Sequence, residues 1–210
     1  MQSLLDGLNR EQQQAVQHTE GPLLILAGAG SGKTKVLTVR IAYLQAQGVN
    51  PYEILAITFT NKAAKEMKER VYKLVGKLAN DIQISTFHSF GLKLLKENYQ
   101  VLGYQKNFTI LDSDDTLTVI KKLIKENNLD PKYYTAKNIK NSISGAKNEL
   151  LDPDAYSKYE YDKNIVSIYS QYQRKLKNSN SVDFDDLLLL PIILFKENPA
   201  ILRYYQEKYK

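Results

Sequence analysis

The residues best suited to chemistry in this sequence lie at 23–34, LLILAGAGSGKT, where a short apolar run meets a glycine-rich turn. No side chain in the turn is larger than serine, and Lys33 and Thr34 follow it. A backbone that wraps a triphosphate needs small side chains, because its N–H groups must approach the phosphate oxygens. Lys33 would reach the β- and γ-phosphates of ATP, and the Thr34 hydroxyl would bind Mg²⁺. We therefore predict a phosphate-binding loop with Lys33 and Thr34 as its catalytic residues.

The loop departs from the pattern G-x-x-x-x-G-K-[ST] only at Ala27, where the pattern has glycine. The alternative is a glycine-rich turn that binds no ligand. Residues 23–26 would form a strand buried on both faces, and a helix would run from about 33 to 47. Because strand, loop and helix follow in the order that a phosphate loop requires, we favour nucleotide binding. The loop residues expected to bind are Ala27, Gly28, Ala29, Gly30, Ser31, Gly32, Lys33 and Thr34.

Strands and helices alternate over the first half of the sequence. Asn9 is expected to cap a short helix, and residues 54–58 and 82–85 form further apolar runs with an amphipathic helix from Asn61 between them. This alternation predicts a parallel sheet covered by helices. Ligands of such sheets bind outside the carboxyl ends of the strands. Two of these ends carry the polar and aromatic segments TFTN (58–61) and STFHS (85–89), so both are candidate binding segments.

The second half is predicted to be helical. The expected helices span about 88–101, 113–127, 136–148 and 162–177, and residues 108–111 favour a strand. The segment 183–186 (DFDD) should cap a further helix, which Pro191 should kink or break, and a last helix follows Pro199. We interpret Asp185 and Asp186 as acids favoured at a helix start, not as a catalytic pair.

Composition narrows the class of protein. Of the 210 residues 43% are apolar and 25% charged, as in ordinary globular proteins, and the absence of cysteine excludes disulfides, thiolate metal sites and a cysteine nucleophile. Residues 1–14 lack the features of a signal peptide and no apolar run approaches membrane-spanning length, so we expect a cytoplasmic protein with no membrane partner. The net charge is +6, and residues 1–108 carry 13 Lys/Arg against 8 Asp/Glu. This excess fits nucleic acid, although a mildly basic solvated surface also produces it.

Five motifs in a fixed order resemble the superfamily-one DNA helicases of the UvrD and Rep type. They are Leu8-Asn9-x-x-Gln12 (Q motif), 27–34 (motif I), 57–64 (motif Ia, ITFTNKAA), 85–89 (motif Ib) and 182–188 (VDFDDLL). The resemblance covers the whole chain. It implies an α/β fold of the P-loop NTPase (RecA-like) type, a parallel sheet flanked by helices, with an all-helical inserted subdomain. It also implies an ATP-driven motor that moves 3′ to 5′ on single-stranded DNA and unwinds duplexes at junctions, in repair or replication, with ATP and Mg²⁺ as cofactors.

The resemblance assigns further site residues. Gln12 would recognise adenine, because its side-chain amide offers both a donor and an acceptor. Lys35 stands where the family has an arginine that packs on the base, and lysine is a poorer planar stacker. The implied DNA contacts are Phe59, Thr60, Asn61, Thr86 and His88. Outside this motif context, Phe59 would more often be a core residue and His88 a helix cap. An aromatic ring at a strand end suits a protein that stacks bases without regard to sequence.

The resemblance also predicts the domain organisation. Residues 1–108 would be a partial RecA-like motor core, 109–190 a helical inserted subdomain and 191–210 a helix that returns toward the core. In the family, the Asp-Glu pair that completes the Mg²⁺ site and the arginine fingers follow later in the chain. We therefore expect a fragment that lacks the second motor domain and hydrolyses ATP negligibly by itself. The pathway and the oligomeric state are left open.

Three alternatives share some of these features. A nuclease-coupled RecB-like or AddA-like helicase subunit would carry the same motifs. A small P-loop kinase fits the chain length but needs an arginine-rich lid, and residues 109–210 contain only Arg174 and Arg203. A non-enzymatic nucleic-acid-binding module fits the basic first half but leaves Gly32-Lys33-Thr34 unexplained.

Overall fold

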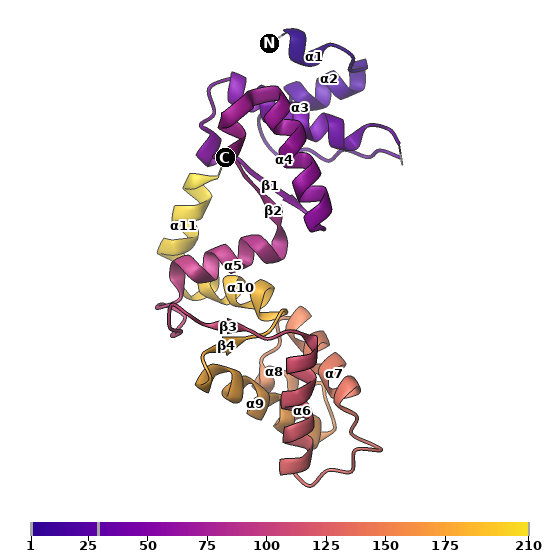
Figure 1. Cartoon of the computed structure of the whole chain (residues 1–210), viewed down its shortest axis with the longest axis vertical. Coiled ribbons are helices and arrows are strands. Elements are labelled where there is room, and N and C mark those ends of the chain that lie inside the picture. Colours follow the sequence, from indigo (N-terminus) through magenta and orange to yellow (C-terminus); the bar gives the residue numbers. More distant parts are fainter. Residues whose placement is uncertain (1, 29, 210) are drawn as a thin grey trace. The chain divides into compact units, whose positions relative to one another are not determined.

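The computed structural model describes residues 2–28 and 30–209 and comprises two compact units (Figure 1). Unit 1 consists of Met1–Phe87 and Leu202–Lys210, and unit 2 consists of His88–Ile201. The chain therefore passes between the units at the start of one helix and inside another. The expected division into 1–108, 109–190 and 191–210 follows the domains of the helicase family, and it stays a prediction.

Unit 1 combines helices with a two-stranded parallel sheet. Its helices are α1 (Gln2–Leu5), α2 (Arg10–Gln17), α3 (Lys33–Ala46) and α4 (Asn61–Val75), with 3₁₀ turns η1 (Pro51–Glu53) and η2 (Gly76–Asn80). Strands β1 (Leu55–Thr58) and β2 (Gln83–Thr86) lie in register, with Thr58 opposite Thr86. The predicted elements corresponding to α2, α3, α4, β1 and β2 are confirmed.

Two apolar clusters form the core of unit 1. Met67 and Val71 of α4 pack with Ile41 of α3 against the sheet, and a second cluster lies between α2 and α3. We expected the apolar face of the amphipathic helix from Asn61 to include Leu74 and Leu78, but these side chains are 41% and 42% exposed. The helix ends at Val75, so the helical period no longer applies to Leu78, which lies in η2.

The first predicted strand, residues 23–26, is not a strand in the structure. Leu24 and Leu26 are 81% and 87% exposed, and only Ile25 packs on the cluster between α2 and α3. A strand buried on both faces needs hydrogen-bonded neighbours, and the described sheet of unit 1 contains only β1 and β2, which pair with each other. The apolar run therefore lies as an extended segment beside the core.

Unit 2 is mainly helical, as predicted. Its helices are α5 (Phe87–Asn98), α6 (Ser113–Glu126), α7 (Ala136–Asn148), α8 (Pro153–Tyr156), α9 (Lys163–Asn178) and α10 (Asp186–Glu197), and α11 (Pro199–Lys208) begins in it. The expected strand at 108–111 is confirmed as β3 (Thr109–Ile110), which pairs in parallel with β4 (Ser181–Val182). The short helix α8 was missed. No helix among residues 2–28 and 30–209 is long and apolar enough to cross a membrane.

The core of unit 2 lies between α6, α7 and α9. The two largest side chains in it are Tyr169 and Tyr172, both fully buried on α9. Asp112 caps α6 through a capping box with Asp115, so the predicted start of this helix is confirmed. The segment 183–186 follows β4 and leads into the start of α10.

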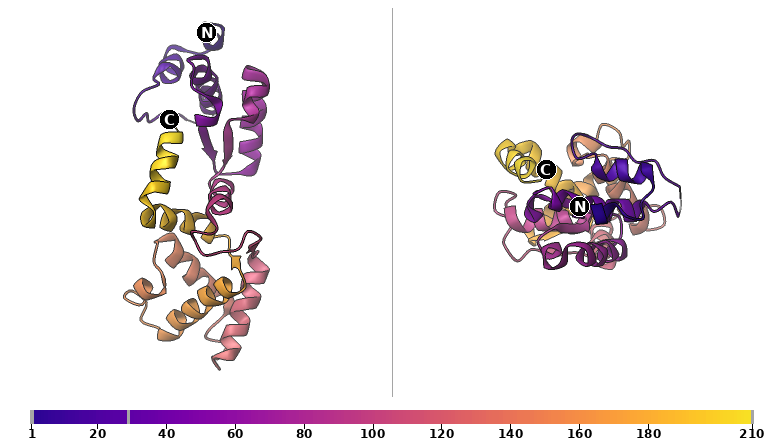
Figure 2. Two further views of the ribbon diagram at one scale, coloured as in Figure 1. Left: turned by 90° about the vertical axis from the view of Figure 1, so that its left-hand side faces the viewer. Right: turned by 90° about the horizontal axis from the view of Figure 1, so that it is seen from above.

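Helices α5 and α10 lie side by side in both views of the chain (Figures 1 and 2). A Cβ added to Gly91 of α5 would stand 1.8 Å from the carbonyl oxygen of Leu187, so only glycine permits this approach. Pro191 has no N–H for the Leu187 carbonyl, four residues earlier, and therefore leaves that oxygen without its helical donor. Helix α10 nevertheless continues through Pro191 to Glu197, so the predicted break there is wrong.

Candidate functional site

The glycine-rich loop of unit 1 is exposed and has a backbone that glycine favours. Gly30 and Gly32 have φ angles of +74° and +82°, in the left-handed region, and nothing lies within 4 Å of a Cβ added at Gly28 or Gly30. The glycines are therefore needed for backbone conformation and leave open space above the loop. Ala29, one of the predicted binding residues, lies outside the described residues.

Helix α3 begins at the end of this loop without a side-chain cap. Gly32 is its N-cap residue and no side chain accepts from the first turn, whose first helical bond runs from the Val36 amide to the Gly32 carbonyl at 3.0 Å. The amides of Lys33, Thr34 and Lys35 come before that bond and have no acceptor within the helix. Unpaired amides at a helix start, at the positive end of the helix dipole, form a site for an anion.

Lys33 is folded back onto the loop. Its Nζ donates to the carbonyl oxygens of Ala27 at 2.8 Å and Gly28 at 2.6 Å. Ser31 closes the same turn by donating from Oγ to the Gly28 carbonyl at 2.7 Å. The ammonium thus lies at the loop where phosphate oxygens would meet the open amides, and the Thr34 hydroxyl is exposed beside it.

Gln12 joins α2 to the loop, and its recognition of adenine stays a prediction. Its Nε2 donates to the Ser31 carbonyl at 3.0 Å, and a Cβ on Gly32 would lie 3.1 Å from that nitrogen. Its Oε1 accepts from the Asn9 amide at 3.0 Å, which completes a capping box with Asn9 at the start of α2. Both ends of the Gln12 amide therefore have partners within the chain.

Two cations hold the surrounding segments together. Lys35 Nζ donates to the Gly7 carbonyl at 2.7 Å, which ties α3 to the turn between α1 and α2. Arg40 donates to the Ala15 carbonyl at 2.7 Å and to the His18 carbonyl, and partial burial lowers the pKa of its guanidinium. A stacking role of Lys35 on a base stays a prediction.

An exposed aromatic pair lies at the carboxyl ends of β1 and β2. Phe59 is 90% exposed and Phe87 is 48% exposed, with ring centroids 5.8 Å apart. The parallel register of the two strands places both ends together. Exposed aromatic rings of this kind offer a surface on which bases stack.

The polar residues predicted at these strand ends differ in their accessibility. Asn61 is exposed at the start of α4, whereas Thr86 is buried, at 5% exposure. Thr60 caps α4 by accepting from the Ala63 amide at 3.1 Å. Their contacts with DNA stay a prediction, and Phe59, Thr60 and Asn61 are the exposed members of this set in unit 1.

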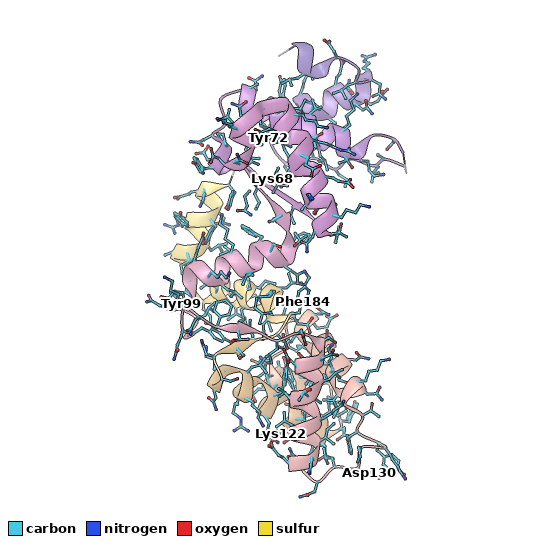
Figure 3. All side chains as sticks on the ribbon, viewed as in Figure 1. Lys68, Tyr72, Tyr99, Lys122, Asp130 and Phe184 are labelled. Atoms are coloured by element: carbon cyan, nitrogen blue, oxygen red, sulfur yellow. The ribbon has the colours of Figure 1, made fainter. Side chains whose placement is uncertain are left out.

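Unit 2 contains a second aromatic pair. His88 of α5 stacks on Phe184 with ring centroids 4.2 Å apart and an interplanar angle of 23°. Phe184, labelled in Figure 3, is 58% exposed, so one part of its ring faces solvent. Residues 183–186 were predicted to cap a helix within the motif 182–188, and the exposure of Phe184 was not predicted. The signal was an aromatic residue among acids at the start of an apolar helix.

Beside Phe184 lies a buried ionic cluster. Lys147 Nζ contacts Asp183 Oδ2 at 2.7 Å and Asp186 Oδ1 at 2.8 Å, and all three residues are at most 4% exposed. Tyr172 donates from its hydroxyl to Asp183 Oδ2 at 2.8 Å. Asp186 is thus a structural residue, in agreement with the interpretation from sequence. Lys147 was missed, although it falls on the apolar stripe of α7 four residues after the buried Ile143.

The two carboxyls of this cluster respond differently to the same burial. Burial raises the pKa of Asp186 to about 6, because the attraction of Lys147 offsets desolvation only in part. Burial also acts to raise the pKa of Asp183, but Lys147 together with the Asp186 amide and the Tyr172 hydroxyl more than offsets it, so this pKa is lowered. The cluster therefore takes up a proton on Asp186 more readily than on Asp183.

A cavity of about 1080 Å³ in unit 1 lies away from the glycine-rich loop. It is lined mainly by α3 and β1, including Leu37, Ile41, Leu55 and Ile57, and none of the described loop residues 27–28 and 30–35 borders it. Its lining also includes Arg40, which donates to the Ala15 and His18 carbonyls. The candidate nucleotide site is the exposed loop, not this cavity.

The geometry of these residues agrees with a family match over nearly the whole sequence. The family model described as the UvrD/REP helicase N-terminal domain matches residues 8–210. The chain therefore belongs to the UvrD/REP helicase family, and the resemblance seen in the motifs is confirmed.

Three similar proteins carry the name ATP-dependent DNA helicase PcrA. The protein of Bacillus subtilis (strain 168) is 53% identical over 211 residues, which cover 99% of this chain. The proteins of Staphylococcus aureus (strain Mu50 / ATCC 700699) and Leuconostoc citreum are 49% and 47% identical, each over 100% of this chain. The chain spans 29% of the length of each of these relatives.

Proposed function

We propose that this chain is the N-terminal part of an ATP-dependent helicase that moves 3′ to 5′ along single-stranded DNA. The observation that carries the proposal is that a member of this family combines an uncapped helix start at a glycine-rich loop with exposed aromatic rings at neighbouring strand ends. Phosphate binding and base stacking are the contacts that a sequence-independent DNA motor requires. The proposal includes a RecA-like P-loop core in residues 1–108 and a helical insertion in 109–190.

The phosphates of ATP would bind at the start of α3. A phosphate oxygen would replace the Ala27 and Gly28 carbonyls as acceptor for Lys33, because a hydrogen bond between two charged groups is about twice as strong as one to a neutral carbonyl. The amides at the start of α3 would accept the same group without any change of fold. The loop thus fits a triphosphate.

Magnesium would bind together with the nucleotide. The described residues contain no cluster of three or more His, Cys, Asp or Glu side chains able to hold a metal ion. The exposed Thr34 hydroxyl supplies one oxygen ligand, and Mg²⁺ commonly takes its others from phosphates and water. When bound, the ion would neutralise charge on the phosphate oxygens.

The adenine would lie near Gln12, whose amide contacts the loop at Ser31. The Gln12 amide would bind the base with its second N–H and the second lone pair of Oε1, or by exchange of the Ser31 carbonyl or the Asn9 amide. Exchange of the Ser31 contact preserves the capping box of α2 and releases the loop at the same time. Binding of the base and opening of the loop would then occur together.

Single-stranded DNA would stack on the aromatic pairs. Phe59 offers the most exposed ring of the unit 1 pair, with Asn61 as a hydrogen-bonding neighbour, and Phe184 with His88 offers the ring in unit 2. Family membership does not favour a small kinase or a simple binding module. A nuclease-coupled helicase subunit is also less favoured, because the similar proteins are named PcrA.

Binding of a fluorescent ATP analogue in the presence of Mg²⁺ tests the nucleotide site. Lys33→Ala should weaken binding by roughly 10- to 150-fold, because it removes hydrogen bonds to charged oxygens. Gln12→Ala should weaken binding less, since only the base contact is lost. Lys77→Ala, which removes the same charge from an exposed position of unit 1, should bind like the unchanged protein.

The controls separate loss of contact from loss of fold. Gln14→Ala alters an exposed glutamine on the same helix as Gln12 and should leave both stability and binding unchanged. Circular dichroism should show that each variant keeps the helix content of the unchanged chain. Equal affinities for Lys33→Ala and Lys77→Ala would show that the loop does not bind phosphates.

A further inference from the structure

Phe184 is an exposed residue held between buried ones. It lies in the short link from β4 to α10, with 58% of its surface exposed, whereas Asp183 and Asp186 on either side are 4% and 1% exposed. An aromatic ring in a link of this kind needs a fixed backbone to keep one orientation. The neighbouring carboxylates provide that fixation.

The link is closed by two reciprocal hydrogen bonds. The Asp183 amide donates to Asp186 Oδ2 at 3.1 Å, and the Asp186 amide donates to Asp183 Oδ1 at 3.0 Å. These bonds span the residues that include Phe184. The second oxygen of each carboxylate is left for Lys147, which contacts Asp183 Oδ2 and Asp186 Oδ1 at 2.7 and 2.8 Å.

Lys147 connects this link to the helical core of unit 2. It lies on α7, and its side chain is completely buried. Tyr172 of α9 adds a hydrogen bond to Asp183 Oδ2 at 2.8 Å and also contacts the Thr116 hydroxyl of α6 at 3.4 Å. Three helices therefore hold the two carboxylates that flank the exposed ring.

On its other side Phe184 is held by α5. His88 stacks on its ring at 4.2 Å, and three residues further along the same helix Gly91 approaches the Leu187 carbonyl so closely that a Cβ would stand 1.8 Å from it. His88 and Gly91 lie on one face of α5, because residues three apart in a helix are neighbours. The same three-residue spacing separates Phe184 from Leu187.

A contribution to the stability of the folded protein does not by itself explain why this ionic cluster is buried. A buried ion pair often stabilises a protein no more than apolar residues of similar volume would, because desolvation of the charges offsets their attraction. Here one ammonium faces two carboxylates, which leaves one negative charge in excess in the interior. What the cluster does fix is the geometry of the link, since its bonds hold Asp183 and Asp186, which lie one and two residues from Phe184.

We propose that Lys147 is a positioning residue for single-stranded DNA, which acts by holding the Asp183–Asp186 link so that the ring of Phe184 stacks on His88 and presents its free face to a base. This inference rests on the proposed function for its DNA contact. The placement of the ring by Lys147 is independent of that function and is measurable in the protein alone.

The test compares Lys147→Met, Phe184→Ala and the double variant in binding to a fluorescent oligo(dT). Phe184→Ala should weaken binding by about 5- to 150-fold, the range for loss of one stacked base. Lys147→Met should weaken it to a similar extent, and the double variant should bind no more weakly than Phe184→Ala. Such non-additivity shows that both changes remove the same contact. Lys175→Met, which breaks an exposed ion pair with Glu126 in the same unit, should bind like the unchanged protein.

A second measurement follows the His88 ring by proton NMR. The chain has only two histidines, so the signal of His88 is resolved beside that of His18, which serves as an internal control. The Phe184 ring should shift the His88 signal upfield. Lys147→Met should reduce this shift and leave His18 unchanged. An unchanged His88 signal in folded Lys147→Met would overturn the inference.

A neutral variant covers the case in which Lys147→Met leaves the chain unfolded. Lys147→Met, Asp183→Asn and Asp186→Asn together keep the side-chain volumes without an unpaired buried charge, so this variant should fold while binding oligo(dT) as weakly as Phe184→Ala. Full binding by the neutral variant would overturn the inference. If Phe184→Ala itself binds normally, the DNA contact at Phe184 fails, whereas the NMR result still decides whether Lys147 positions the ring.

Discussion

The electrostatics of single residues are most unusual where Lys147 meets two carboxylates. The pKa of Asp186 lies near 6 because of its burial, whereas that of Asp183 is lowered by its partners. An aspartate in an unfolded chain has a pKa of about 3.9. Between about pH 4 and pH 6 the folded state therefore binds more protons at Asp186 than the unfolded state does, and the unfolding free energy falls as the pH rises through this window. Asp183 acts in the opposite sense, since its contribution is lost as the pH falls below about 4.

Urea unfolding at a series of pH values measures this dependence. The unfolding free energy should be higher near pH 5 than near pH 7, apart from the contributions of other groups, and Asp186→Asn should flatten the slope between about pH 4 and pH 6. Asp185→Asn removes the adjacent carboxylate, which takes no part in the Lys147 cluster, and should leave the slope in place. A slope unaffected by Asp186→Asn would place the titrating group elsewhere.

Local spacing identified residues of the exposed loop, whereas the buried ionic cluster was missed. Lys33 and Gln12 both contact the loop, and their roles in nucleotide binding stay predictions. Lys147 could not be assigned from sequence, since its partners Asp183 and Asp186 lie 36 and 39 residues away and a lone lysine in a helix usually faces solvent. Only its place on the apolar stripe of α7 indicated burial.

At the scale of the elements, the packing of α5 on α10 depends on glycine at position 91. Alanine favours a helix over glycine by about 1 kcal/mol, but at Gly91 its Cβ would meet the Leu187 carbonyl at 1.8 Å. The clash involves backbone that cannot rotate away, so Gly91→Ala should destabilise unit 2 by about 1–3 kcal/mol. The helices must separate, and the stack of His88 on Phe184 should loosen with them.

Gly145 provides the matched control within unit 2. It lies in α7 with nothing within 4 Å of an added Cβ, so Gly145→Ala should stabilise the protein by about 0.5–1 kcal/mol. Chemical denaturation of both variants measures the difference. Equal stability of Gly91→Ala and Gly145→Ala would mean that α5 and α10 do not approach as closely as described.

Local signals predicted most helices but not every strand. Caps at Asn9 and Asp112 gave the starts of α2 and α6, because these signals act within one turn. The run 23–26 has the composition of a buried strand, but a strand forms only with a neighbour to pair with, and the described sheet of unit 1 ends at β1 and β2. At Pro191 the tertiary contact at Gly91 covers the carbonyl that proline leaves open, and the helix persists.

At the scale of the whole molecule, each unit carries an aromatic pair suited to stacking, and the basic excess lies mainly in residues 1–108. Lysines and arginines neutralise phosphates and give binding that weakens with salt, whereas ring stacking contributes at any salt concentration. The two contributions are therefore separable. Loss of an aromatic ring should lower the affinity for single strands without changing its salt dependence.

The most direct test of the account is the affinity of the chain for a fluorescent oligo(dT), measured over a series of salt concentrations for Phe59→Ala and Tyr72→Ala. Tyr72, labelled in Figure 3, is an exposed aromatic residue of α4 in the same unit and serves as the control. We predict that Phe59→Ala weakens binding by about 5- to 150-fold with an unchanged salt slope, and that Tyr72→Ala binds like the unchanged protein. Binding of oligo(dT) by Phe59→Ala with the affinity of Tyr72→Ala would contradict a DNA track at the ends of β1 and β2.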